Sequence, residues 1–284
     1  MLLIADGGST KTAWSLVNPH TKAIQEFRTE GYNPYFIGTI GIIDSIQNQL
    51  LPQLETGLVT QIYFYGAGCS TPEKNDIVFQ AIKACFPSAN VYLGHDMLAA
   101  ARALLQHEKG FAAILGTGAN TCMYDGKDVS LNIDSLGYLM GDEGSGSYIG
   151  KKVVRDFMRG YLPVEIQKAF TEKYHLSNED IFDNLYHKPL PNRFLASFCD
   201  FASEHYEHPH IQEIIRQSFF DFFNNLVSHY PDYKNYSFNC IGSVGYNFKN
   251  ILMEVSEQQF GMKTGKILRS PIADLVKYHL ESAG

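Results

Sequence analysis

The chain has 284 residues, 45% of them hydrophobic and 19% charged, which is the composition of a globular protein with room for one large or two smaller domains. Its net charge of −7, without any cluster of lysine and arginine, argues against nucleic acid or an anionic membrane as a partner. No apolar run approaches the ~18 residues of a membrane span, and residues 1–15 lack the basic start of a secretory signal peptide, so we expect neither.

In the first part of the chain the pattern alternates between strands and helices. Apolar runs predict strands at 2–6, 12–18, 23–31, 61–68 and 90–96. Helical spacing predicts helices at 39–54, 77–86 and 97–107, the first of them strained near its end by Pro52. The first two strands are expected to form a β-hairpin.

After residue 110 the pattern restarts, with strands predicted at 111–118 and 121–128 and a glycine-rich stretch at 136–150. A helical region is expected from 151 to about 230, then a strand and turn at 236–245 and helices at 247–261 and 270–282. We therefore predict two domains, 1–109 and 110–284, the second with a helical insertion and with a last helix that can pack back on the first.

Five dispersed cysteines show no CxxC pair, so the sequence signals neither a zinc nor an iron–sulfur site. An odd, scattered set is typical of reduced thiols, which predicts a cytoplasmic protein. The cysteines are Cys69, Cys85, Cys122, Cys199 and Cys240.

The most informative feature is a glycine-rich turn that occurs twice. Residues 2–12 read LLIADGGSTKT and residues 111–121 read FAAILGTGANT, so that an offset of 109 residues places Gly7 on Gly116 and Thr12 on Thr121. Each turn follows a buried type of strand and precedes a second one. Two such hairpin tips indicate two related domains that bind one nucleotide.

Both turns have the chemistry to bind phosphate. Glycine lets backbone N–H groups approach phosphate oxygens closely, and Ser or Thr adds a hydroxyl donor. Lys11 adds a positive charge, and Asp6 is a candidate to hold Mg²⁺ through water. The candidate phosphate-binding residues are Gly7, Gly8, Ser9, Thr10 and Lys11 in the first turn and Gly116, Thr117, Gly118 and Asn120 in the second. Neither GxxxxGK[ST] nor GxGxxG occurs.

Several motifs resemble, in order, those of the sugar kinase/actin/chaperone ATPase superfamily. DGGSTKT at 6–12 resembles its first phosphate motif, LGTGANT at 115–121 its second and IGSVG at 241–245 its adenosine motif. GYNPYFIG at 31–38 and GYLMGDEGSGSYIG at 137–150 resemble the N-acetylglucosamine kinase branch, also called the BadF/BadG/BcrA/BcrD ATPase-like family. The resemblance covers nearly the whole chain.

This resemblance implies an α/β fold of two ribonuclease-H-like (actin-like ATPase) domains that flank a nucleotide/sugar cleft. Thr10 and Thr117 fall where the family contacts ATP phosphates. The adenosine would be bound by Gly242, Ser243 and Gly245. ATP and Mg²⁺ are the cofactors that the family implies.

The same resemblance assigns the residues around the acceptor. Asp96 falls on the family's catalytic base, although an Asp at the start of a helix is also a common N-cap and the two roles can coexist. The residues that fall on the sugar-binding positions, or close to them, are Asn33, Asn120, Gly137 and Asp142. Leu136 departs from the pattern, since a vertebrate enzyme of the family has Trp there, and this leaves the identity of the sugar open.

The expected activity is ATP-dependent phosphorylation of N-acetylglucosamine or a related amino sugar, at the 6-hydroxyl, by a protein that can form a homodimer as its relatives do. Two alternatives stay open. One is an ATPase of the reductase-activator type, which would need cysteines for an iron–sulfur cluster. The other is a sugar-sensing or nucleotide-sensing protein without turnover.

Overall fold

A computed structural model of the chain describes residues 1–8 and 10–282. The chain folds as two compact units. The first unit consists of Met1–Glu108, the short segment Gly126–Asp128 and the chain from Pro271 onward. The second consists of Lys109–Asp125 and Val129–Ser270.

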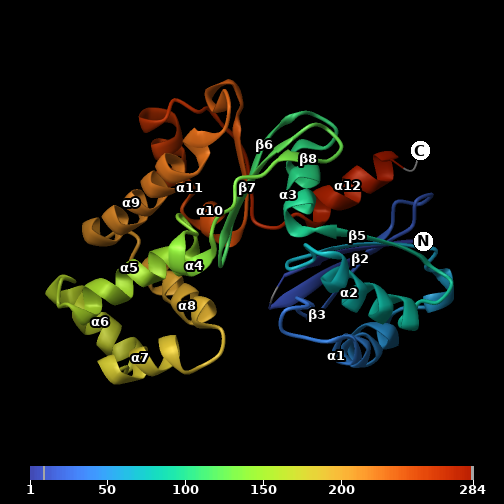
Figure 1. The fold of residues 1–284 in the computed structure, drawn as a ribbon, viewed down its shortest axis with the longest axis horizontal. Coiled ribbons are helices and arrows are strands. Elements are labelled where there is room, and N and C mark those ends of the chain that lie inside the picture. Colours follow the sequence, from blue (N-terminus) through green and yellow to red (C-terminus); the bar gives the residue numbers. More distant parts are fainter. Residues whose placement is uncertain (9, 283–284) are drawn as a thin grey trace. The chain divides into compact units, whose positions relative to one another are not determined.

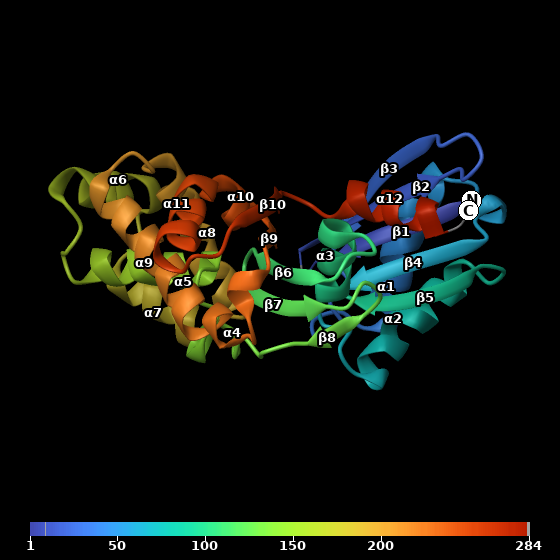
Figure 2. The same cartoon turned by 90° about the horizontal axis from the view of Figure 1, so that it is seen from above.

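The first unit is built on a five-stranded sheet in the order β3-β2-β1-β4-β5, which can be followed in Figure 2. The antiparallel part of the sheet is formed by β1 (Leu2–Gly7), β2 (Lys11–Val17) and β3 (Ile24–Glu30). To β1 the sheet adds β4 (Gln61–Gly66) and β5 (Asn90–His95), both parallel to it. The predicted hairpin and the strand predicted at 23–31 are therefore present.

Helices cover both faces of this sheet. In Figure 1, α1 (Thr39–Ser45) and α2 (Pro72–Cys85) lie on one face, and α3 (Asp96–Leu105) and α12 (Ile272–Ser282) lie on the other. Apolar side chains that alternate along β1, β2 and β4 fill the core beneath α1 and α2, with Trp14 fully buried among them. The last helix of the chain thus belongs to the first unit.

The second unit repeats this strand order along a later part of the chain. Its sheet runs β8-β7-β6-β9-β10, again a set of three antiparallel strands followed by two strands parallel to the first (Figure 2). The strands are β6 (Gly110–Leu115), β7 (Ala119–Tyr124), β8 (Val129–Leu131), β9 (Phe238–Ile241) and β10 (Thr264–Leu268).

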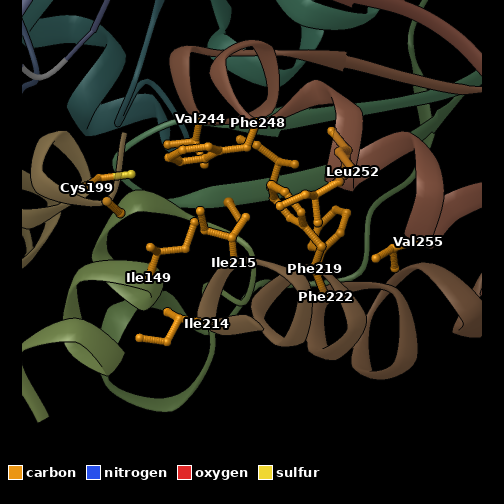
Figure 3. Packing of buried hydrophobic residues seen from close by; sticks show 14 of the residues in the cluster. Ile149, Cys199, Ile214, Ile215, Phe219, Phe222, Val244, Phe248, Leu252 and Val255 are labelled. Carbon is orange, nitrogen blue, oxygen red and sulfur yellow. The ribbon is translucent and has the colours of Figure 1, made fainter. Parts of the chain in front are cut away.

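Between β8 and β9 the second unit carries a long helical segment. It comprises α4 (Gly137–Met140), α5 (Gly146–Met158), α6 (Val164–Tyr174), α7 (Asn178–Tyr186), α8 (Pro191–Glu204) and α9 (Pro209–Asn225). Between β9 and β10 lie α10 (Ser243–Asn247) and α11 (Lys249–Glu254). Figure 3 shows side chains from α5, α8, α9 and α11 packed into one apolar core, Phe219, Phe222 and Leu252 among them.

The two hairpins share their topology but not their register. In the first, Gly7 pairs with Thr12, so residues 8–11 connect the last pair. In the second, Leu115 pairs with Ala119, so only residues 116–118 connect it. The offset of 109 residues therefore aligns one strand of each hairpin but not both. Thr12 and Thr121, which the sequence alignment superposes, do not occupy equivalent positions.

Other differences concern element ends. The helix predicted at 39–54 is α-helical only to Ser45; it continues as a π-helical turn and then a 3-10 turn at Leu51–Gln53, where Pro52 cannot supply an N–H group. Neither β8 as a separate strand nor β10 was predicted, and no residue of these short strands is buried. Among the described residues, no helix has the length and apolar character needed to cross a membrane.

Candidate active site

The carboxyl edge of the first sheet brings together three segments, two of which, the first glycine turn and Asp96, carry predicted site residues. Gly7 at the end of β1 is in register with Gly66 at the end of β4, and Gly66 with His95 at the end of β5. The parallel strands therefore deliver the first glycine turn, the loop after β4 and Asp96 to the same edge. Ligand sites of open α/β sheets characteristically lie at this edge.

Asp96 is the first residue of α3, directly after β5. The N-cap position belongs to His95, whose Nδ1 accepts the N–H of Leu98 at 3.2 Å. The Asp96 carboxylate accepts the N–H of its neighbour Met97 at 2.8 Å. Burial raises the pKa of the Asp96 carboxyl above its usual range. A carboxylate in this position can accept a proton from a nearby hydroxyl group.

Asp6, near the end of β1, shares the electrostatic environment of Asp96. Burial and the negative charge of Asp96 raise its pKa to about 7, and Lys11 at the start of β2 opposes the shift. A carboxylate so placed is costly to ionise unless a cation compensates it. The donor set therefore fits a Mg²⁺ ion that Asp6 would hold through water, since Mg²⁺ commonly keeps most of its waters and takes one or two carboxylates. Groups of three or more Asp, Glu, His or Cys side chains arranged for a metal do not occur among the described residues.

Asn33 is buried beside the loop that follows β4. Its Oδ1 accepts the N–H of Tyr35 at 3.0 Å, and its carbonyl accepts the N–H groups of Phe36 and Ile37. Gly68, with φ +81°, approaches so closely that a Cβ there would lie 2.4 Å from Asn33 Oδ1. The loop after β4 thus fixes the side chain of Asn33, a contribution of Gly68 that the sequence analysis did not anticipate.

The first glycine turn closes with a bond from the N–H of Gly8 to the carbonyl of Lys11 at 2.9 Å. Gly7 is pressed against the ring of Phe64, where a Cβ would lie 2.6 Å from Cζ. Thr10 is exposed, and its carbonyl accepts the N–H of Gly31. Ser9, also predicted to bind phosphate, lies outside the described residues.

The second glycine turn is held by the start of α5. The N–H groups of Gly146 and Ser147 donate to the carbonyls of Gly116 and Thr117 at 2.8 and 3.0 Å. Ser145 caps α5, its hydroxyl accepting the N–H of Tyr148. The GDEGSGS stretch therefore supports the turn directly, which the sequence analysis had not predicted.

Asp142 braces the other side of the same turn. Its Oδ1 accepts the N–H of Ala119 at 3.1 Å, and a Cβ at Gly118 would lie 3.0 Å from its Oδ2. Burial raises the pKa of the Asp142 carboxyl, while the Ala119 N–H and the Ser135 hydroxyl oppose the shift by bonding the charged form. Asp142, a candidate sugar-binding residue, is thus hydrogen-bonded to the candidate phosphate-binding turn.

The remaining sugar-side candidates lie nearby in the second unit. The Oδ1 of Asn120 accepts the N–H of Thr121 and the Nδ2 of Asn132, both at 2.9 Å. Gly137 opens α4 with φ +68°, and no atom lies within 4 Å of a Cβ built on it. Leu136 precedes it in the left-handed region with its side chain 59% exposed.

The IGSVG turn packs against the second glycine turn. Gly242 has φ +130°, and a Cβ there would lie 2.1 Å from the carbonyl oxygen of Leu115. Ser243 begins α10, and Gly245 leaves room for the Cys240 sulfur. The structure therefore brings the predicted phosphate and adenosine motifs of this unit into direct contact.

These features are those of the actin-like ATPase fold. The repeated strand order and paired hairpins define two ribonuclease-H-like domains of the actin-like ATPase fold. MreB 5 of Spiroplasma citri, solved with bound AMPPNP, has this fold with a TM-score of 0.58 at 10% identity, over 100% of this chain and 98% of its own. No protein-family model and no curated protein sequence matches the chain.

Two solved structures are more similar. A "Putative N-acetylglucosamine Kinase" from Porphyromonas gingivalis is 35% identical over 100% of both chains, with a TM-score of 0.94. A second protein with that description, from Chromobacterium violaceum, is 16% identical over 98% of both chains, with a TM-score of 0.68. The chain belongs to the N-acetylglucosamine kinase-like family of the sugar kinase/actin-like ATPase superfamily.

Proposed function

We propose that this protein transfers the γ-phosphoryl group of ATP to a hydroxyl of N-acetylglucosamine or a related amino sugar, at the 6-position. The observation that carries the proposal is Asp96, a carboxylate at the carboxyl edge of the sheet that accepts the N–H of the neighbouring Met97. The full-length identity of 35% to a protein described as a "Putative N-acetylglucosamine Kinase" supports the same substrate class.

In the proposed reaction Asp96 accepts the proton of the attacking sugar hydroxyl. The hydroxyl oxygen then forms a bond to the γ-phosphorus, and the bond from that phosphorus to the bridging oxygen breaks to release ADP. Asn33, Asn120, Gly137 and Asp142 would position the sugar. Most of the rate enhancement would come from positioning the acceptor hydroxyl, and a general base would increase the rate by a further factor of about 10²–10⁴.

The glycine turns would bind the phosphates through backbone N–H groups and the hydroxyls of Thr10 and Thr117. Gly242, Ser243 and Gly245 would lie against the adenosine. Mg²⁺, held through water by Asp6, would offset the negative charge of the phosphates when bound. Lys11 is exposed at the start of β2 and would add a further positive charge.

The test measures ADP release from ATP and Mg²⁺ with a panel of amino sugars. We expect N-acetylglucosamine or a close relative to raise ADP release above the rate without sugar. Asp96→Asn should lower kcat about 10²–10⁴-fold, and wild-type activity should fall as the pH drops below the raised pKa of Asp96, because only the carboxylate can accept a proton.

Asp44→Asn is the matched control, since Asp44 is exposed on α1 of the same unit. Its kcat should equal that of the wild type. The kinase proposal fails if no sugar stimulates ADP release, and the role of Asp96 fails if Asp96→Asn keeps full activity.

The reductase-activator alternative is disfavoured by the cysteines. All five are buried, and burial raises the pKa of each thiol, which opposes the thiolate form that a cluster needs. Free thiols also accord with a cytoplasmic location, which we propose. A homodimer is proposed as well, supported by exposed Tyr161 and Val164 (63% and 84%) in the second unit, and light scattering would test it.

A further inference from the structure

The helical segment of the second unit contains a groove that the proposed reaction does not use. Its volume is about 550 Å³, which is within the range of small-molecule sites. Helices α4, α5, α7 and α8 contribute to its lining, with Leu139, Phe182 and Tyr186 among the apolar residues and Lys151, Arg155 and Arg159 as the basic ones.

One wall of the groove is apolar and accessible. Phe182 and Tyr186 lie one turn apart on α7, with ring centroids 6.2 Å apart. Phe182 is 50% exposed, and Tyr186 and Leu139 are each 75% exposed. Large side chains this accessible, gathered at a hollow, suit an apolar ligand body.

Another part of the lining is basic. Lys151 and Arg155 lie four residues apart on α5, and Arg159 follows at the same interval as the residue that caps the end of the helix, so the three follow one side of it. Of the described residues that line the groove, none is acidic. The groove therefore combines an apolar wall with a row of positive charges.

These three basic groups differ in what they already bind. Arg155 forms an ion pair with Asp156 at 2.7 Å, so much of its charge is compensated. The Nζ of Lys151 donates to the carbonyl of Tyr138 at 3.2 Å and retains other protons. Arg159 has no ion-pair partner among the residues described, which leaves its guanidinium for a ligand.

The groove adjoins the candidate sugar loop. Tyr138 and Leu139 follow Gly137 directly in α4, and the negative charge of Asp142 acts on Lys151. A ligand in the groove would therefore contact the same short helix that begins at a proposed sugar-binding residue.

We propose that this groove binds a carboxylate carried on an apolar body, with Lys151 and Arg159 bonding the carboxylate and Phe182 and Tyr186 packing on the body. The carboxylate can come from an acidic substituent of the acceptor sugar or from a separate small acid. The first source rests on the proposed kinase function, and the second does not.

Calorimetric titration of the full chain separates the sources, with N-acetylmuramic acid and 4-phenylbutyrate as probes. N-Acetylmuramic acid carries a lactyl carboxylate on an amino sugar, whereas 4-phenylbutyrate has no sugar. Binding of the first in competition with N-acetylglucosamine indicates the substituent. Binding of the second in the presence of N-acetylglucosamine indicates a separate acid.

Arg159→Ala should lower the affinity for the probe that binds by about 10-fold or more, because a hydrogen bond to a charged group is lost. Lys151→Met and Phe182→Ala should each weaken it as well. Arg28→Ala, at an exposed position on β3 of the first unit, should leave both affinities unchanged. Arg159→Ala should keep the wild-type KM for N-acetylglucosamine.

The inference is overturned if neither probe binds, or if Arg159→Ala and Lys151→Met bind it as tightly as the wild type does. Failure of the kinase proposal looks different. In that case no sugar stimulates ADP release, while Arg159-dependent binding of 4-phenylbutyrate persists.

Discussion

Two carboxylates, those of Asp6 and Asp96, lie near the same edge of the first sheet. Asp6 and Asp96 are both desolvated, and the charge of Asp96 adds to the rise in the pKa of Asp6 to about 7. Burying both as ions is unfavourable without a cation. Ionising both carboxylates is unfavourable in the free protein and becomes favourable when a cation binds beside them. This accords with the proposed use of Mg²⁺ and ATP.

This cost predicts how Asp6→Asn changes stability with pH. Between pH 3.8 and about 7 folded Asp6 holds a proton that the unfolded chain has released, so wild-type stability falls as the pH rises through this window. Asn removes this dependence. In urea unfolding without nucleotide or Mg²⁺, Asp6→Asn should match the wild type near pH 4 and exceed it at pH 8, by up to about 4 kcal/mol at about 1.4 kcal/mol for each pKa unit.

Asp44→Asn is again the control, and its difference from the wild type should be the same at both pH values. A wild type that is more stable than Asp6→Asn at pH 8 would show that Asp6 is compensated in the free protein. Because Asp6 is proposed to hold Mg²⁺ through water, the stabilised variant should also have a raised KM for Mg-ATP.

Substitution of Asp142 tests whether the candidate sugar-binding residue and the candidate phosphate-binding turn depend on each other. Asp142→Ala leaves the buried N–H of Ala119 without its acceptor, next to the second glycine turn. A lost bond of 1–3 kcal/mol should raise KM for both ATP and the sugar by about 10-fold to 100-fold. Asp142→Asn keeps an acceptor oxygen and should mainly affect the sugar. Steady-state kinetics with each substrate varied would contradict this if Asp142→Ala changed only the sugar's KM.

At the scale of elements, the turn from β9 to α10 depends on one glycine. The Cβ of Gly242→Ala would meet the Leu115 carbonyl oxygen at 2.1 Å, and φ +130° is itself unfavourable for alanine. We expect a loss of several kcal/mol or a displaced second glycine turn, and therefore a much weaker affinity for ATP.

Gly57→Ala is the matched control, because no atom lies within 4 Å of its Cβ and its φ is not positive. Chemical denaturation and nucleotide titration should show near wild-type values for Gly57→Ala. Equal effects of the two substitutions would mean that the loss at Gly242 does not come from the close approach of Leu115.

The elements also show what sequence could predict. Alternating apolar residues and glycine turns were sufficient for both hairpins and for the strand that leads to Asp96. They were insufficient for the hairpin register, because pairing depends on turn length and on the partner strand. The contacts of Gly68 with Asn33 and of Gly146 with Gly116 were not predicted either. Close contacts between residues far apart in the sequence leave no periodic pattern in it. The strand β10 was not predicted because TGKIL is short and none of its residues is buried.

At the scale of the whole molecule, one strand order occurs twice, yet the helices after β5 and β10 both belong to the first unit. A chain of hydrogen bonds fixes the second of them. Arg102 on α3 donates to the Tyr65 hydroxyl at 2.7 Å, and this hydroxyl lies 2.9 Å from Nε2 of His279 on α12. Burial lowers the pKa of His279 to about 3, so the ring is neutral and its Nε2 can accept the Tyr65 proton.

The single tryptophan makes this attachment measurable. Trp14 is fully buried in the first unit, on β2, which α12 contacts. His279→Ala removes the acceptor of Tyr65 and a ring stacked on Tyr63 at 3.9 Å, so it should destabilise the first unit by about 1–3 kcal/mol. The denaturation midpoint seen by tryptophan fluorescence should fall, and a truncation before Pro271 should lower it further.

Circular dichroism at the same denaturant concentrations reports both units, and the second holds most of the helices. If the terminal helix stabilises only the unit it packs in, the fluorescence transition should move below the main dichroism transition in both variants. Transitions that shift together would instead mean that the two units unfold as one cooperative body. His205→Ala, at the end of α8 in the second unit, should shift the dichroism transition and leave the fluorescence transition in place.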